Sequence, residues 1–161
     1  QGHATDIYAE PRVQEAIRRI FHYVFADFKY PGVPEMKLHP VKDHPLLIDN
    51  VKFTPVRCYH HKLPVYGFRV GDLTYITDTN FIADEEMAKI EGTKILIINA
   101  LRKEKHISHF NLEEALIVAE RVGAEKTFLT HLSHQFGFHQ NIQSELPHNV
   151  FVAFDGLKLE L

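Results

Sequence analysis

The sequence has one cysteine, Cys58, and no tryptophan among its 161 residues. A single cysteine excludes an internal disulfide and a zinc site built from several thiolates, so any metal site must use His, Asp or Glu. No apolar run approaches the roughly 18 residues that a membrane helix needs, and the N-terminus lacks the layout of a signal peptide. We therefore expect a soluble, cytoplasmic protein with no membrane partner.

Neither sign of charge is in large excess, since the formal net charge is only -3. There is no overall basic field, which argues against nucleic acid as a partner. With 45% hydrophobic and 24% charged residues, the chain has the composition of a globular protein with a real core. We expect one domain over residues 1–161. Histidine is the compositional outlier, with 12 residues.

Hydrophobic periodicity predicts the elements of secondary structure. Apolar residues at helical spacing predict a helix over 11–29 that begins at Pro11. A strand-like period follows over 36–77, with a hairpin turn at Gly71 and Asp72. The remaining half alternates helix and strand, and we expect helices at 84–91 and 111–123 and strands at 94–98 and 126–130. Asn111 with Glu114 three residues later predicts a capping box, and Gly123 predicts the end of that helix.

This order of elements is typical of an α/β protein, whose late strands would be parallel. Three of these strands end in polar residues that can bind a ligand or transfer a proton: Asp78, Asn99 and His131. The carboxyl ends of parallel strands face one edge of a sheet, so these side chains should converge there. Each alone has a plain structural explanation, as a turn cap or a core residue bonded to a carbonyl. Their occurrence together favours a functional site.

Two further histidines, His60 and His61, precede the hairpin that leads to Asp78. Hairpin pairing places the start of one strand beside the end of the next, so we expect His61 to lie near Asp78. Imidazole and carboxylate together suit Zn²⁺, Mn²⁺ or Fe²⁺. His106 and His109 lie in a loop rich in Lys and Arg, where solvated surface is the common explanation.

The runs "HHKLPVYGFR", "YITDT" and "SHFNLEEALIVAERVGAEKTFLTHLSH" resemble the C-terminal part of the metallo-β-lactamase superfamily. The resemblance is nearest to the cyclic-phosphate phosphodiesterases of phosphonate breakdown, and more distant to ribonuclease Z. It implies a partial αββα metallo-β-lactamase fold, made of the C-terminal part of the sandwich. It also implies a hydrolase with two divalent metal ions, Zn or Mn, that acts on a small phosphate-ester substrate through a metal-bound hydroxide.

The resemblance also implies roles for single residues. A histidine six positions before the Gly of a "GF" pair is a metal ligand in such proteins, which selects His61 and leaves His60 as its neighbour. Asp78 would bridge the metals and His131 would bind the second one. His109, 22 positions before His131, would contact the phosphate as a catalytic residue, and His134 would line the substrate pocket.

The family's His-x-His-x-Asp-His motif is missing from this chain. "HPVKDH" matches its spacing at His39, Asp43 and His44, but Val41 replaces the second histidine and Pro40 interrupts the run. We therefore expect the N-terminal half that bears the motif to be absent, leaving three ligands that hold metal weakly or not at all and a chain that is inactive alone. Exposed sheet edges would favour self-association or pairing with the missing half. The alternatives are an RNA-processing nuclease and a metal-free binding or scaffold domain.

Overall fold

The computed structural model describes residues 3–160, which form two compact units with their boundary between His44 and Pro45. The smaller unit holds β1 (Thr5–Ala9), α1 (Pro11–Ile20), η1 (His22–Val24) and β2 (Met36–Pro40). β1 and β2 pair in parallel, with Thr5 opposite Met36, so this unit is a strand–helix–strand crossover. None of the residues of α1 is buried.

The predicted helix over 11–29 is too long. α1 ends at Ile20 because Phe21 leaves the helical region, with φ -103° and ψ 39°, and the chain continues as the short 3₁₀ turn η1. The Phe21 backbone N–H still donates to the Ile17 carbonyl, which completes the last helical turn. Helical spacing beyond Ile20 therefore reflects apolar side chains in a turn and not a continuing helix.

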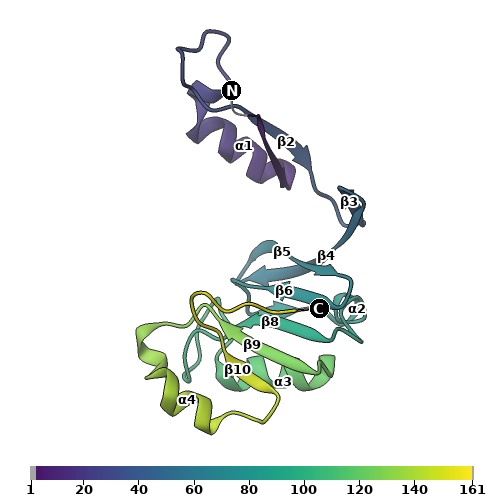
Figure 1. Ribbon diagram of the computed structural model, residues 1–161, viewed down its shortest axis with the longest axis vertical. Coiled ribbons are helices and arrows are strands. Elements are labelled where there is room, and N and C mark those ends of the chain that lie inside the picture. Colours follow the sequence, from purple (N-terminus) through teal and green to yellow (C-terminus); the bar gives the residue numbers. More distant parts are fainter. Residues whose placement is uncertain (1–2, 161) are drawn as a thin grey trace. The chain divides into compact units, whose positions relative to one another are not determined.

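The larger unit is built on an eight-stranded mixed sheet (Figure 1). Its main path runs β10-β9-β8-β6-β5-β4-β3, and β7 pairs with β4. The strands β6, β8, β9 and β10 are parallel, whereas β3, β4, β5 and β6 pair antiparallel in succession. The elements of this unit are β3 (Leu46–Ile48), β4 (Val51–His60), β5 (Leu63–Val70), β6 (Leu73–Ile76), β7 (Phe81–Ile82), α2 (Asp84–Met87), β8 (Ile95–Asn99), α3 (Leu112–Val122), β9 (Lys126–Thr130), η2 (His134–Phe136), α4 (His139–Glu145) and β10 (Val150–Val152).

Alternation along the strands gives this sheet two different faces. One face carries the fully buried side chains Ile76, Leu96, Ile98 and Leu129, which share one core cluster with the buried side of α3. The opposite face carries a row of large side chains that lie opposite one another from β5 to β10. Its members are Phe68, Tyr75, Ile97, Phe128 and Phe151. Tyr75 in this row is 45% exposed.

The helix α3 forms as the sequence predicts. Asn111 accepts a hydrogen bond from the Glu114 backbone N–H, and the Glu114 side chain accepts one from the Asn111 backbone N–H, which completes the capping box. Gly123 ends the helix in the left-handed conformation, at φ 68°, which glycine adopts without steric cost. Both ends of α3 are therefore capped. The cap at Asn111 fixes the backbone where the segment that carries His109 enters the helix.

The predicted helix over 84–91 is shorter, since α2 ends at Met87. The following residues form tighter turns, in which the Lys89 and Ile90 N–H groups donate to carbonyls three residues earlier. The Arg69 guanidinium donates to the Lys89 and Glu91 carbonyls and so satisfies this turn segment. Among the described residues, no helix is long and apolar enough to cross a membrane.

Candidate metal and hydrolase site

The ends of the parallel strands bring the candidate residues together, as expected. Asp78 follows β6, Asn99 ends β8, and His131 follows β9. Asp78 and His131 both lie in the left-handed region, at φ 56° and 59°. A non-glycine residue there costs on the order of 1 kcal/mol, and such strain is concentrated at functional sites. The chain therefore turns sharply after β6 and after β9, and both side chains point toward the same edge of the sheet.

Asn99 holds the backbone directly after Asp78. Its side-chain Nδ2 donates to the Thr79 carbonyl at 3.0 Å, and its Oδ1 accepts from the Thr79 N–H at 3.1 Å. Both residues are fully buried. Asn99 thus forms a two-bond clamp between β8 and the end of β6, which fixes the direction of Asp78. The sequence placed Asn99 at this edge but gave no sign of its partner.

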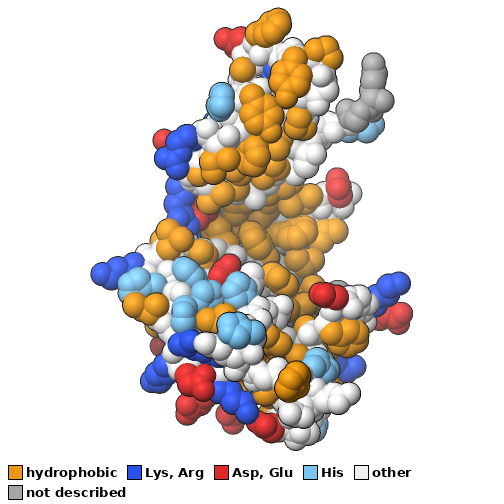
Figure 2. All heavy atoms as spheres, turned by 90° about the vertical axis from the view of Figure 1, so that its left-hand side faces the viewer, with side chains coloured by type: hydrophobic (Ala, Val, Ile, Leu, Met, Phe, Trp, Pro, Cys, Tyr) orange, Lys and Arg blue, Asp and Glu red, His pale blue; other side chains and the backbone are white. Residues whose placement is uncertain are grey.

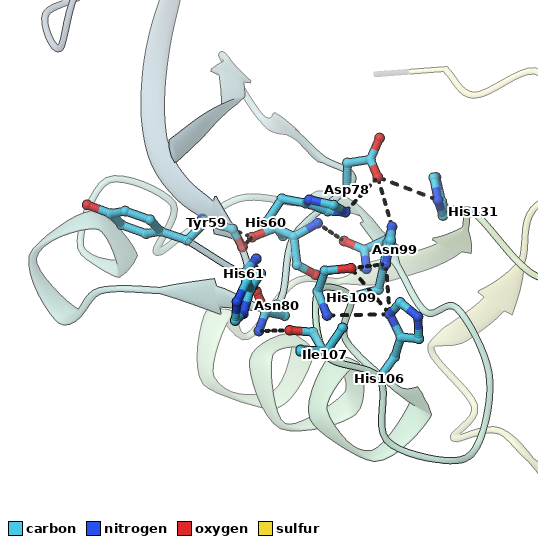
Figure 3. Close-up of polar contacts among 12 residues, drawn as sticks. Tyr59, His60, His61, Asp78, Asn80, Asn99, His106, Ile107, His109 and His131 are labelled. Atoms are coloured by element: carbon cyan, nitrogen blue, oxygen red, sulfur yellow. Dashed lines mark hydrogen bonds and ion pairs between the residues drawn. The ribbon is translucent and has the colours of Figure 1, made fainter. Parts of the chain in front are cut away.

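The Asp78 carboxylate is the centre of the site. Its Oδ1 lies 2.8 Å from His109 Nε2, 3.6 Å from His131 Nε2 and 3.8 Å from His60 Nε2. Figure 3 shows His60 and His131 on either side of Asp78, with His109 between them. Figure 2 shows histidine side chains gathered in one patch on the surface. Among the described residues, His60, Asp78 and His109 form the group whose ligand atoms all lie within 4.8 Å of one another.

His60, and not His61, lies beside Asp78, so the expected position of His61 is wrong. His61 has φ 57° and begins the turn between β4 and β5, with its backbone N–H donating to Asn80 Oδ1 at 2.8 Å. Its exposed ring points away from the Asp78 carboxylate (Figure 3). His60 is the last residue of β4 and pairs with Leu63. The left-handed turn at His61 therefore separates the directions of the two neighbouring rings.

His109 is the most enclosed histidine of the site, with a side chain only 11% exposed. Burial lowers the pKa of His109, and this effect exceeds the opposing hydrogen bond to Asp78, while the charges of His131 and His60 lower it further. On its other side, His109 Nδ1 lies 3.0 Å from Ser108 Oγ and 3.1 Å from His106 Nδ1. His106 and Ser108 therefore belong to the site, although the Lys- and Arg-rich loop suggested only solvated surface.

The other candidate histidines lie outside this group. His134 begins η2 and is exposed. His39 of the "HPVKDH" run lies in β2, where its Nε2 is 2.6 Å from Asp6 Oδ1. His39 also stacks on Tyr8, with ring centroids 4.7 Å apart. The near match to the family motif is thus part of the parallel strand pair of the smaller unit.

Comparison with solved structures gives relatives of the same fold. A crystal structure described as a new diphosphatase from the PhnP family matches with a TM-score of 0.89 and 31% identity, covering 99% of this chain and 60% of that one. The metallo-β-lactamase fold protein YhfI from Bacillus subtilis has a TM-score of 0.76 at 24% identity, covering 97% and 65%. Human tRNase Z, short form, has a TM-score of 0.63 at 18% identity, covering 98% and 68%. The last two show the fold alone.

One curated relative carries a different name. The octanoyltransferase of Porphyromonas gingivalis (strain ATCC BAA-308 / W83) is 36% identical over 154 residues. The match takes in 94% of this chain but only 31% of that protein. Most of the relative lies outside the match, so its name does not assign an activity to the matched segment.

The family assignment rests on more of the chain than the site alone. A family model described as a Beta-lactamase superfamily domain matches residues 1–132. This range includes His60 at the end of β4, Asp78 after β6, the loop with His109, and His131. The chain therefore belongs to the β-lactamase superfamily and has the metallo-β-lactamase fold, over about 60% of the length of the diphosphatase relative.

Proposed function

We propose that this chain supplies part of the active site of a metal-dependent hydrolase that cleaves phosphate esters, with a small cyclic phosphodiester as substrate. The observation that carries the proposal is the position of Asp78 Oδ1 between His60 Nε2 and His131 Nε2. The diphosphatase relative, at 31% identity and a TM-score of 0.89, supports phosphate chemistry. The reaction and the substrate rest on this likeness together with the donor set.

The donor set fits a divalent cation. Two donor atoms on one tetrahedral ion, each about 2.0–2.2 Å from it, lie roughly 3.4 Å apart. The distances of 3.6 Å and 3.8 Å from Asp78 Oδ1 to the nitrogens of His131 and His60 are close to this separation and too long for direct hydrogen bonds. His60, Asp78 and His131 would therefore hold Zn²⁺ or Mn²⁺, with Asp78 as the shared ligand. A bound ion of this kind polarises phosphoryl oxygens and lowers the pKa of water.

His109 has a different role in this proposal. Its 2.8 Å contact with Asp78 Oδ1 is a direct hydrogen bond, and a carboxylate only accepts, so His109 Nε2 carries the proton. An N–H in this position can donate to a phosphoryl or leaving-group oxygen, as a general acid or by stabilising charge. We assign the catalytic role to His109 and a place at the pocket margin to His134.

Three protein ligands are few for a dinuclear site, which needs more carboxylate and imidazole donors to hold both ions close together. We therefore propose that the chain alone binds metal weakly and turns over little or no substrate. The likeness to tRNase Z is one of fold, and the net charge of -3 gives no support to RNA as substrate. Phosphate-ester hydrolysis remains the better-supported reaction.

The test is hydrolysis of bis(p-nitrophenyl) phosphate with Zn²⁺ or Mn²⁺ added. The chain alone is expected to show no turnover, whereas the chain expressed together with any upstream coding sequence that holds the missing ligand motif is expected to be active. Asp78→Ala should abolish that activity. Activity retained in the Asp78→Ala protein would refute the assignment, and an upstream sequence without such a motif would favour a metal-free scaffold.

A further inference from the structure

The half-buried side chain of Asn80, two residues after Asp78, bridges two loops at the edge of the sheet. Its Oδ1 accepts a hydrogen bond from the His61 backbone N–H at 2.8 Å, and its Nδ2 donates to the Ile107 carbonyl at 3.2 Å (Figure 3). An amide carries its acceptor and its donors on two different atoms, so one side chain can join groups on opposite sides. The two partners also fix the orientation of the amide, since an N–H needs the oxygen and a carbonyl needs the nitrogen.

Asn80 holds the backbone on both sides of His60. The Asn80 backbone N–H donates to the Tyr59 carbonyl at 2.9 Å, and its side chain accepts from the N–H of His61. Tyr59 and His61 are the two neighbours of His60 in the chain. The last residue of β4 and the turn that follows it are therefore both bonded to Asn80, and the His60 ring starts from a fixed backbone.

The loop that carries His109 is also held on both sides. The carbonyl of Ile107, two residues before His109, accepts the bond from Asn80. The N–H of Phe110, one residue after His109, donates to the Thr79 carbonyl at 2.8 Å. Ile107 has a side chain that is 69% exposed, so packing contributes little to its position. The bond from Asn80 is thus the contact that ties this side of the loop to the segment after Asp78.

His131 has a different support. The residue before it, Thr130, is in β9, and its carbonyl accepts from the Ala100 N–H at 3.0 Å. This bond belongs to the edge of the parallel sheet and does not involve Asn80. Loss of the Asn80 side chain should therefore disturb two of the three histidines around Asp78 and leave His131 in place.

We propose that Asn80 is a positioning residue that joins the two loops beside Asp78 and so sets the separation of His60 and His109. The ring centroids of these two histidines lie 4.7 Å apart, and both rings approach Asp78 Oδ1. The geometric part of the proposal concerns the chain alone. Its consequence for turnover rests on the proposed function, in which His60 would bind metal and His109 would act on the substrate.

The test is NMR of the metal-free chain at fixed pH, which follows the imidazole ¹H–¹³C signals and the hydrogen exchange of the His61 amide. In Asn80→Ala, the His61 amide loses its acceptor and should exchange about fivefold faster or more. The imidazole signals of His60 and His109 should shift. The signal of His131 should stay where it is.

Asn80→Asp separates the two bonds of the side chain. A carboxylate still accepts from the His61 N–H but cannot donate to the Ile107 carbonyl. The His61 amide should therefore stay protected, whereas the His109 signals should shift as they do in Asn80→Ala. Asn80→Asp also decides the question if the backbone amide spectrum shows that Asn80→Ala does not fold.

Asn149→Ala is the matched control. Asn149 is half-buried, precedes β10 at the edge where the parallel strands begin, and donates from Nδ2 to the Ala124 carbonyl at 3.4 Å. Its removal should leave the site signals unchanged. Unshifted His109 signals in both Asn80 variants, or an equal shift in Asn149→Ala, would overturn the proposal.

Activity gives a second readout. In an active preparation saturated with metal, Asn80→Ala should lower kcat about tenfold or more with little change in KM, because a misplaced catalytic group costs rate more than binding. An unchanged kcat would contradict the positioning role. The NMR measurement needs neither metal nor substrate, so its failure would leave the hydrolase proposal standing. Failure of the hydrolase proposal would in turn leave the NMR result intact.

Discussion

Asn99 holds the backbone behind Asp78, and its replacement by alanine should destabilise the larger unit and loosen the site. The substitution removes the hydrogen bonds of 3.0 Å and 3.1 Å to the Thr79 carbonyl and N–H. Thr79 is fully buried, so water does not replace them. The Thr79 carbonyl keeps the Phe110 N–H as a donor at 2.8 Å, so the Thr79 N–H is the group that loses its acceptor. A buried group left without a partner costs about 1–3 kcal/mol.

This loss is a measurable part of the total stability of a domain, which is about 5–15 kcal/mol. Thermal unfolding followed by circular dichroism should show a Tm lower by roughly 5 °C or more. Amide hydrogen exchange at Thr79 should also accelerate, because its N–H loses the Asn99 acceptor. Metal affinity should fall in parallel, since the Asp78 carboxylate is no longer fixed.

Thr127→Val is the matched control. Thr127 lies in the same sheet, in β9, is fully buried, and its hydroxyl has no hydrogen-bond partner within the part of the chain that the structure describes. Exchange of that hydroxyl for a methyl group should leave stability unchanged or raise it slightly. A Tm for Asn99→Ala within about 1 °C of the unmodified protein, or an equal loss in Thr127→Val, would refute the clamp.

Three further predictions concern other parts of the larger unit. Burial raises the pKa of Cys58 to about 11 and the side chain is fully buried, so a thiol reagent at pH 8 should react only after denaturation; rapid reaction of the folded chain would contradict this. Burial lowers the pKa of His109 below its usual 6.5, so as the pH falls the unfolded chain binds a proton at this residue before the folded chain does. The free energy of unfolding should therefore decrease more with falling pH in the unmodified protein than in His109→Gln. Equal pH dependence of the two proteins in urea titrations would count against this. Tyr75, 45% exposed in its row of large side chains, should contribute to self-association, which Tyr75→Glu should reduce in light scattering; a monomeric unmodified chain at high concentration would exclude this role.

Local signals in the sequence were sufficient for much of the fold. The capping box of Asn111 and Glu114 and the left-handed Gly123 lie within one helix, and the structure has both. The convergence of Asp78 and His131 also followed, because parallel pairing places strand ends at one edge. These features depend on neighbouring residues or on a general rule of sheet topology.

The remaining features depend on contacts that local pattern does not encode. The choice between His60 and His61 depends on the left-handed turn at His61, which a count of positions does not show. The bond from Asn99 to Thr79 joins residues 20 apart, and the contact of His106 with His109 depends on how a charged loop folds back. The helix predicted over 11–29 was too long because apolar residues continue at helical spacing past Ile20, whereas the backbone leaves the helical region at Phe21.

The central claim is that His60, Asp78 and His131 supply ligands for divalent cations at the ends of the strands, with Asp78 as the shared ligand. It is tested most directly by titrating Zn²⁺ into the chain against a fluorescent chelator, with His60→Ala and His61→Ala compared side by side. We predict weak binding by the unmodified chain, a loss of about tenfold or more in His60→Ala, and no change in His61→Ala. Binding that His61→Ala abolishes and His60→Ala preserves would contradict the account, as would an unmodified chain that binds no better than Asp78→Ala.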